Sequence, residues 1–171
     1  HIISARDRCD GTVDRIRCVR TKTHKYIRNY HPERPYMQFN GYKKQQYPLW
    51  TLAPVLKAQG KLNPAQEKFL APCRPYEELY DLTADPDELT NLAGDEASAD
   101  VLEDLSRRMD EWIDMFGDQG EVSEDPRMIA EEAQKMRESD VERMAAKGLT
   151  PDVSDEDFVA WWTSDLLGES P

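Results

Sequence analysis

An amphipathic helix over residues 100–116 constrains the fold of this chain more than any other feature. Its apolar residues recur every three to four positions, which places them along one side of a helix: Val101, Leu102, Leu105, Met109, Trp112, Ile113 and Phe116. Asp100 and Glu103 predict the start of the helix as a capping pair, and Gly117 predicts its end. Such a stripe must be buried, so the helix is expected to cover a sheet.

Segments with two-residue alternation supply that sheet. Residues 15–20 and 25–30 predict a β-hairpin. Their connection, residues 21–24, lacks Asn-Gly or Asp-Gly and therefore predicts a four-residue loop. Residues 79–82 predict a further strand. The expected fold class is α+β: a small antiparallel sheet, made of a hairpin plus at least one further strand, covered by an amphipathic helix, with a helical C-terminal extension.

Residues 78–93, in the middle of the chain, predict a strand that runs into a turn. After the strand, Asp85-Pro86 predicts a tight turn, because the Asp side chain accepts from backbone N–H groups and the Pro fixes φ. A capped helical turn is expected to follow. These features predict local structure, and they do not predict a catalytic group.

The first residues combine an apolar pair, Ile2-Ile3, with a polar segment, residues 4–11, that carries four charges in five residues. Such a segment is not expected inside a strand, so it predicts a surface loop. Its Arg and Asp side chains can simply pair with one another. They can also form an anion-binding loop, because the planar fork of Arg fits sulfate, phosphate or carboxylate oxygens.

Residues 31–76 are interrupted by prolines and predict a long loop. Within it a short helix is expected over residues 63–70, with Asn63 as the N-cap and Gln66 completing a capping box. Aromatic residues alternate here with lysines, a pattern found in single-stranded nucleic-acid binders. The formal net charge of −12 argues against a nucleic-acid partner.

Two more helices are expected in the C-terminal part. One begins at Asp125-Pro126 and runs to about residue 147, and the other begins at Ser154. The second has an apolar stripe that must dock on this domain, on a missing one or on another subunit: Phe158, Trp162 and Leu166. The expected organisation is a subdomain over residues 1–120 and an acidic helical extension over residues 121–171.

Charge divides the chain and the reactive residues are sparse. Residues 1–78 contain 15 Lys and Arg against 7 Asp and Glu, and residues 79–171 contain 7 against 27. The first part is therefore suited to an anionic ligand. The three cysteines form no C-x-x-C pair and the three histidines are dispersed, so neither a disulfide framework, a metal site nor a catalytic residue is predicted.

The ends and the hydropathy of the chain carry two expectations. No apolar run approaches the roughly 20 residues of a membrane-spanning helix, and no charged-then-apolar leader is present. The chain begins at His1, without an initiator Met and inside what reads as a strand. An upstream portion is therefore expected to be missing.

Three segments in order resemble one enzyme family. They are Ser-Ala-Arg-Asp-Arg at residues 4–8, the hairpin with His-Pro-Glu at residues 16–33, and residues 78–93, which are similar to the pattern E-L-Y-D-L-x-x-D-P-x-E-x-x-N-L-A. Together they resemble the C-terminal subdomain of the type I sulfatases of the alkaline-phosphatase superfamily, and most of all its heparan N-sulfatase (sulfamidase)-like bacterial branch. The resemblance covers residues 2–120.

The resemblance implies an enzyme that hydrolyses sulfate esters or sulfamates with a formylglycine nucleophile and a bound Ca²⁺. Both belong to a larger N-terminal domain, so this chain is expected to be the C-terminal part of an α/β sulfatase fold, in a periplasmic or secreted protein. The formylglycine is made from Cys or Ser in a C-x-P-x-R motif. Cys73 begins a similar segment, but Glu77 stands where the Arg belongs, so Cys73 is interpreted as unrelated and the nucleophile as absent.

The resemblance also implies a role at the rim of the substrate pocket. The candidate contacts to the sulfated saccharide, or another small anionic substrate, are Arg6, Asp7, Arg8, His31 and Glu33. The further expected partners are the missing N-terminal catalytic domain and, through residues 121–171, a second copy of the chain. Two alternatives stay open: a phosphate-ester hydrolase of the same superfamily, and a non-catalytic module whose acidic tail and Trp161-Trp162 bind a partner protein.

Overall fold

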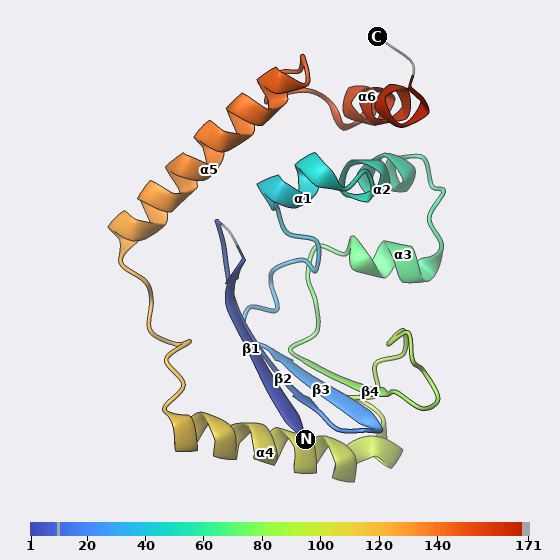
Figure 1. Cartoon of the computed structure of the whole chain (residues 1–171). Coiled ribbons are helices and arrows are strands. Elements are labelled where there is room, and N and C mark those ends of the chain that lie inside the picture. Colours follow the sequence, from blue (N-terminus) through green and yellow to red (C-terminus); the bar gives the residue numbers. More distant parts are fainter. Residues whose placement is uncertain (10, 169–171) are drawn as a thin grey trace. The chain divides into compact units, whose positions relative to one another are not determined.

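The computed structural model describes residues 1–9 and 11–168, which form two compact units. Unit 1 comprises residues 1–9, 13–35 and 72–123, and unit 2 comprises the other described residues. Strands and helices are both present, so the predicted α+β class is confirmed (Figure 1). Residues 36–71 belong to the same unit as the C-terminal helices. The division at residue 120 into a subdomain and an extension stays a prediction.

Unit 1 is built on an antiparallel sheet in the order β1-β2-β3-β4. The strands are β1 (Ile2–Cys9), β2 (Thr12–Arg20), β3 (His24–Asn29) and β4 (Glu77–Asp81). The register of β2 and β3 pairs Arg20 with Lys25, which confirms the predicted hairpin and its four-residue loop. The Thr21 hydroxyl accepts hydrogen bonds from the N–H groups of Thr23 and His24 at 3.2 and 2.9 Å, and so closes that loop.

The loop predicted at residues 4–11 was wrong, because most of this segment forms β1. The strand lies at an edge of the sheet, next to β2 alone. An edge strand tolerates charged residues because much of its length faces solvent. The charge of Asp7 is also compensated, since its carboxylate lies 2.7 Å from Nη1 of Arg17 on β2.

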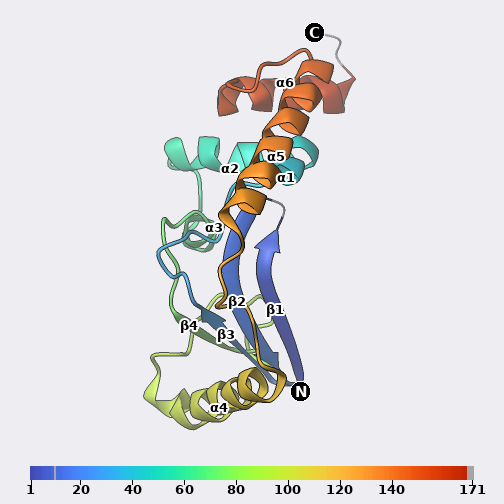
Figure 2. The ribbon, with the colours of Figure 1, turned by 90° about the vertical axis from the view of Figure 1, so that its left-hand side faces the viewer.

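The predicted amphipathic helix is α4 (Ala99–Phe116), which packs on the sheet of unit 1 (Figure 2). Leu105 and Met109 are fully buried in a core with Val19, Tyr26 and Leu79, as the apolar stripe indicated. The helix ends at Gly117 with φ 60°, in the left-handed region that favours glycine.

The ends of the predicted stripe and cap differ from expectation. A 3₁₀ turn, η1 (Glu96–Ser98), precedes α4, and the side chain that caps it is Asp95, which accepts from Ala97 N–H at 3.3 Å. The N-cap of α4 itself is Ser98, whose side chain makes no capping hydrogen bond, so the predicted capping pair of Asp100 and Glu103 was wrong. Phe116 is exposed, because the helix continues past the sheet.

The helical turn predicted before residue 93 was also wrong. Asn91 instead binds the backbone of β4: its Oδ1 accepts from Leu79 N–H at 2.9 Å and its Nδ2 donates to Glu77 C=O at 3.0 Å. Asp85 accepts from Thr90 N–H at 2.8 Å. Side chains that bind backbone groups in this way compete with the helix, and here Asn91 takes the place of a neighbouring strand at the edge of the sheet.

Unit 2 consists of helices: α1 (Gly41–Gln46), α2 (Leu49–Ala58), α3 (Pro64–Phe69), α5 (Pro126–Ala146) and α6 (Asp155–Leu167). α3 has the predicted capping box between Asn63 and Gln66, and Asp125 caps α5 as expected. The long loop predicted over residues 31–76 was wrong where α1 and α2 form. Prolines suggested a break there, but Pro48 supplies the carbonyl to which Leu52 N–H donates at 2.9 Å, and so starts α2.

The C-terminal aromatic stripe docks inside unit 2. α6 packs on α2, and Phe158 and Trp162 are buried with Met144 of α5. Lys147 lies 4.3 Å from the centre of the Trp161 ring. Trp162 therefore stabilises its own unit, and Leu166 is the member of the stripe that stays exposed. In the described part of the chain, no helix combines the length and apolarity of a membrane span.

Candidate functional site

Three of the predicted substrate contacts lie on β1. Arg6, Asp7 and Arg8 are consecutive there, so their side chains alternate between the two faces of the sheet. Asp7 is engaged by Arg17. The Nε atom of Arg6 is buried and has no hydrogen-bond partner among the described residues. An unpartnered buried donor is costly, which makes Arg6 the member of this trio best suited to donate to an oxygen of a ligand.

The other two predicted contacts lie in the turn after β3. Nδ1 of His31 is 3.3 Å from Oε1 of Glu33, and Arg34 lies 3.6 Å from the same carboxylate oxygen. The carbonyl of His31 accepts from Arg34 N–H at 3.1 Å. The His31 and Glu33 side chains are both accessible to solvent. The structure thus brings His31 and Glu33 together, and contact of any of the five residues with a substrate stays a prediction.

Sequence reasoning missed a buried arginine, Arg17, in the middle of β2. Its side chain is 0% exposed and is held by Asp118 through two bonds, Nη2 to Oδ1 at 2.6 Å and Nε to Oδ2 at 3.1 Å. A Cβ on Gly120 would lie 1.9 Å from Nη2 of Arg17, so glycine is required for the guanidinium to approach this backbone. The alternation of β2 gave a signal, since Arg17 and the core residue Val19 share one face.

Asp118 also binds a second arginine. Nη2 of Arg15 lies 3.4 Å from Oδ2 of Asp118, and the Arg15 guanidinium stacks 3.9 Å from the centre of the Tyr30 ring. Burial opposes ionisation of Asp118, but the hydrogen bonds and charge of Arg17, with those of Arg15 and Gly120 N–H, lower the pKa of Asp118 below its usual value. The carboxylate is thus the anionic centre of this cluster.

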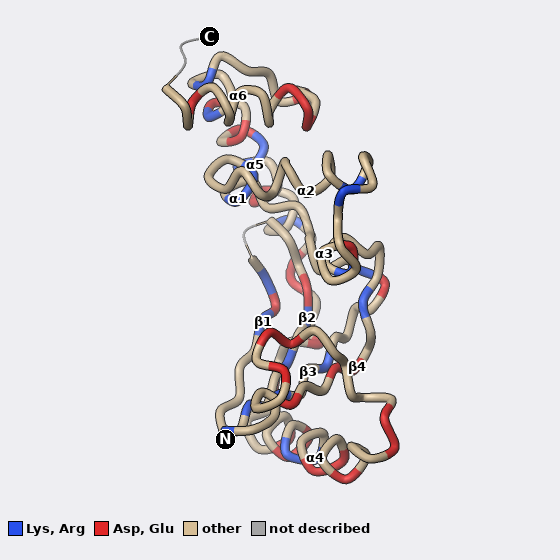
Figure 3. The backbone as a smooth tube through the Cα atoms, turned by 90° about the vertical axis from the view of Figure 1, so that its right-hand side faces the viewer, with Lys and Arg blue, Asp and Glu red and all other residues tan. Residues whose placement is uncertain are grey.

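A second network joins β3 to α4. Arg28 donates to Asp110 at 2.5 Å, to the Ser106 hydroxyl at 2.8 Å and to the Tyr26 hydroxyl at 2.9 Å, and Tyr26 donates to Glu77. Burial, with the bond to Glu77, raises the pKa of Tyr26. The Tyr26 phenol stays protonated at neutral pH, so Tyr26 can orient neighbouring groups but does not serve as a base there. Figure 3 shows the basic and acidic residues interspersed along the strands of the sheet and along α4.

Two residues of the resemblance motif, Glu78 and Asn91, make hydrogen bonds that hold the sheet. Glu78, buried on β4, accepts from Asn29 Nδ2 at 2.7 Å and from the Tyr80 hydroxyl. Asn91 holds the edge of the same strand, as described above. In this chain these motif residues therefore stabilise β4 at the edge of the sheet.

Ca²⁺, which the resemblance implies, needs several oxygen ligands. The described residues contain no group of three or more Asp, Glu, His or Cys side chains arranged to hold a metal ion. They do not fit such a site.

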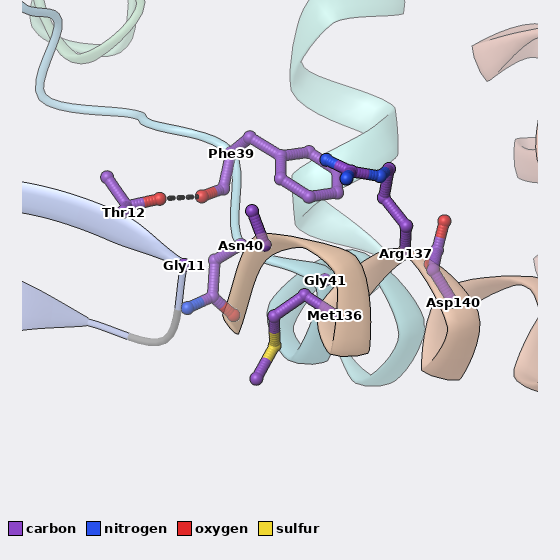
Figure 4. A pocket seen from close by; sticks show the side chains of 9 residues that line it. Gly11, Thr12, Phe39, Asn40, Gly41, Met136, Arg137 and Asp140 are labelled. Atoms are coloured by element: carbon purple, nitrogen blue, oxygen red, sulfur yellow. Dashed lines mark hydrogen bonds between the residues drawn. The ribbon is translucent and has the colours of Figure 1, made fainter. Parts of the chain in front are cut away.

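Unit 2 contains a hollow that sequence reasoning did not identify (Figure 4). Two neighbouring cavities, of about 300 and 170 Å³, share Gly41, Met136 and Asp140, and we call them together the α1–α5 groove. Nε2 of Gln45 donates to Oδ1 of Asp140 at 2.8 Å and joins the two helices at the groove. Its other lining residues are Gly11, Thr12, Phe39, Asn40, Tyr42, Ala133, Arg137, Ser139 and Arg143.

Comparison with known proteins relates the chain to a sulfatase. No family model matches it. It is 40% identical over 124 residues to an ulvan-active sulfatase of Formosa agariphila, and the match covers 72% of this chain and 21% of that protein. The chain thus spans about a fifth of the length of this relative. The segment is sulfatase-related, and the narrower assignment to the heparan N-sulfatase-like branch stays a prediction.

Proposed function

We propose that this chain is part of a type I sulfatase that hydrolyses sulfate esters of a sulfated carbohydrate. The observation that carries the proposal is the 40% identity over 124 residues to an ulvan-active sulfatase. That relative is named for ulvan, so sulfated polysaccharides of this kind are the first substrates to test. The basic balance of residues 1–78 suits an anionic substrate. In the reaction water and the ester yield the sugar hydroxyl and sulfate.

We place the nucleophile and the calcium ion outside these 171 residues. The chain contains no complete C-x-P-x-R segment, since Glu77 stands at the Arg position after Cys73. The described residues do not fit a metal site. The matched part of the chain is about a fifth of the relative, which leaves ample length for a catalytic domain. A formylglycine there would perform the cleavage.

The part played by this chain is to position the substrate. Arg6 and Arg8 on β1, and His31 and Glu33 after β3, stand at the pocket rim in this proposal, and Asp7 orients Arg17. Fixed charges that hold a sulfated sugar in place lower the entropic cost of the reaction. The unpartnered Nε of Arg6 supports its choice as the leading contact.

Arg6→Ala in the full-length protein tests this role. The Michaelis constant for a sulfated saccharide should rise at least about tenfold, with a smaller change in kcat and an unchanged melting temperature, because one charge-assisted hydrogen bond is worth about 1.5–3 kcal/mol. Lys22→Ala, an exposed cation in the loop between β2 and β3, is the matched control. A melting temperature that collapses in Arg6→Ala would assign Arg6 to the fold.

The reaction class is tested on the intact enzyme with sulfated and phosphorylated model esters. Sulfate release from the sulfated ester and from ulvan supports the proposal. Phosphate release alone would favour a phosphatase of the same superfamily. A coding sequence whose upstream part holds neither C-x-P-x-R nor S-x-P-x-R would remove the enzyme assignment.

Self-association through residues 121–171 is a separate proposal. Sedimentation of the full-length protein over a range of concentrations tests it. A monomer at every concentration contradicts this contact, and a concentration-dependent dimer supports it.

A further inference from the structure

We propose that the α1–α5 groove of unit 2 binds an anionic saccharide. The choice of a saccharide rests on the proposed function, while the preference for an anion rests on the groove itself. Figure 4 shows residues that line the larger of its two cavities, with Phe39 and Asn40 just before α1 and Met136, Arg137 and Asp140 on α5.

The groove is concave and held in shape by a direct contact. Its larger cavity, about 300 Å³, reaches the lower end of the range of small-molecule sites. The Gln45–Asp140 hydrogen bond fixes α1 against α5 within unit 2. The Asn40 side chain accepts from Lys43 N–H at 2.8 Å and so fixes the start of α1. A ligand would therefore meet a preformed surface.

Two aromatic rings are exposed at the groove. Phe39 is 62% exposed and Tyr42 is 52% exposed, and the Tyr42 ring is supported edge-on by Tyr47, with ring centres 6.1 Å apart. The faces of aromatic rings carry partial negative charge. The C–H groups of a sugar ring are weakly positive and lie on flat faces, so they stack on such rings while the hydroxyl groups point to water.

The charges at the groove favour an anion although the chain is acidic overall. Arg137 and Arg143 line it from α5, and neither makes a hydrogen bond or ion pair with another described residue. Asp140, the one acid among the described lining residues, accepts from Gln45, and its single charge is outnumbered by the two guanidinium groups. The glutamates of α5 are absent from the described lining. A guanidinium presents two parallel donors that match a sulfate or a carboxylate.

These observations favour a saccharide over a nucleic acid. A nucleic-acid strand needs a row of cations that follows its phosphates, and the net charge of −12 repels such a polyanion outside the groove. A short concave site with two rings and two separated guanidinium groups instead suits a small number of sugar residues that carry isolated sulfate or carboxylate groups.

Binding of dextran sulfate, used as a short oligosaccharide that carries isolated sulfate groups, to the full-length protein, measured by isothermal titration calorimetry, tests the proposal. Neutral dextran is the matched uncharged probe. The double variant Arg137→Gln/Arg143→Gln should weaken binding of dextran sulfate at least tenfold, and Phe39→Ala/Tyr42→Ala should do the same. Arg127→Gln, an exposed cation on the same helix, should bind as the unchanged protein does.

Each outcome is decisive for the groove. Unchanged binding by the Arg137→Gln/Arg143→Gln variant overturns the proposal, and that variant stays informative if the aromatic one fails to fold. Equal affinity for an oligo-dT strand, lost in the same variants, also overturns it in favour of a nucleic-acid site. Sulfate release from a small aryl sulfate is measured in parallel: a protein that binds dextran sulfate through the groove but releases no sulfate contradicts the sulfatase proposal and keeps the groove.

Discussion

Asp118→Asn should destabilise unit 1 far more than the same change at another acidic partner of a strand arginine. Asp118 is 7% exposed and is the bidentate partner of Arg17, which is 0% exposed. The substitution keeps the shape of the side chain but removes its charge. Arg17 would then stay buried with Asp7, which is 48% exposed, as its remaining carboxylate.

The two substitutions are expected to differ clearly in how much they lower the free energy of unfolding. Removing one partner of a buried pair costs about 3–5 kcal/mol, and we expect the lower end, about 3 kcal/mol, because Asp7 compensates in part. Asp110→Asn is the matched control: Asp110 is 55% exposed beside Arg28, so water screens the pair. This change should cost no more than about 1 kcal/mol.

Hydrogen exchange followed by mass spectrometry suits this comparison, because peptides from β2 and β3 report on unit 1 by itself. Asp118→Asn should reduce the protection of these amides by about two orders of magnitude, and Asp110→Asn by less than tenfold. Equal effects of the two changes would refute the reasoning that burial of Arg17 sets the cost.

The pH dependence supplies a second check with a defined sign. The pKa of Asp118 is lower in the folded state, so its contribution to stability is fully present above the unfolded value of about 3.9 and is lost as pH falls through the folded pKa. The difference in stability between the unchanged protein and Asp118→Asn should therefore shrink below about pH 4. A difference that persists at acidic pH would assign the loss to packing.

Two further changes test the sheet edge and the core by urea denaturation. Asn91→Ala should cost about 2 kcal/mol, because the N–H of Leu79 and the C=O of Glu77 lose their partner; a loss below about 0.5 kcal/mol would mean that water replaces the amide. Leu105→Ala should cost about 3 kcal/mol through the cavity it leaves in a 2% exposed site, whereas Met115→Ala on the exposed side of α4 should change stability by less than about 0.5 kcal/mol. Similar losses for both helix positions would contradict the assigned faces of α4.

The periodicity of the sequence predicted the regular helices and strands, and it failed where a single side chain decided which local structure forms. The stripe of α4 and the alternation of β2 and β3 could be read directly, since each follows from the repeat of its own backbone. β1 was mistaken for a loop because its charges suggest exposure, and exposure at a sheet edge is compatible with a strand. The turn before Asn91 was mistaken for helix because an amide side chain that replaces a strand partner leaves no periodic signal.

The candidate sites, too, could be predicted from the sequence only in part. Arg6, Arg8, His31 and Glu33 could be nominated from their positions within a resemblance, but the pairing of His31 with Glu33 and the unpartnered Nε of Arg6 required the folded chain. The α1–α5 groove joins residues about a hundred positions apart, such as Gln45 and Asp140, through a hydrogen bond that no local pattern announces.

By itself, the sequence determined the α+β class, the hairpin and its four-residue loop, the cap of α3, and the helix that covers the sheet, because each depends on interactions between near neighbours. The tertiary structure decided which charges are buried. Arg17 looks like any other basic residue of a polar strand until Asp118, 101 positions away, meets its guanidinium over Gly120. Contacts between residues far apart in the sequence determine which charges are buried, and burial determines how much each charge contributes to stability.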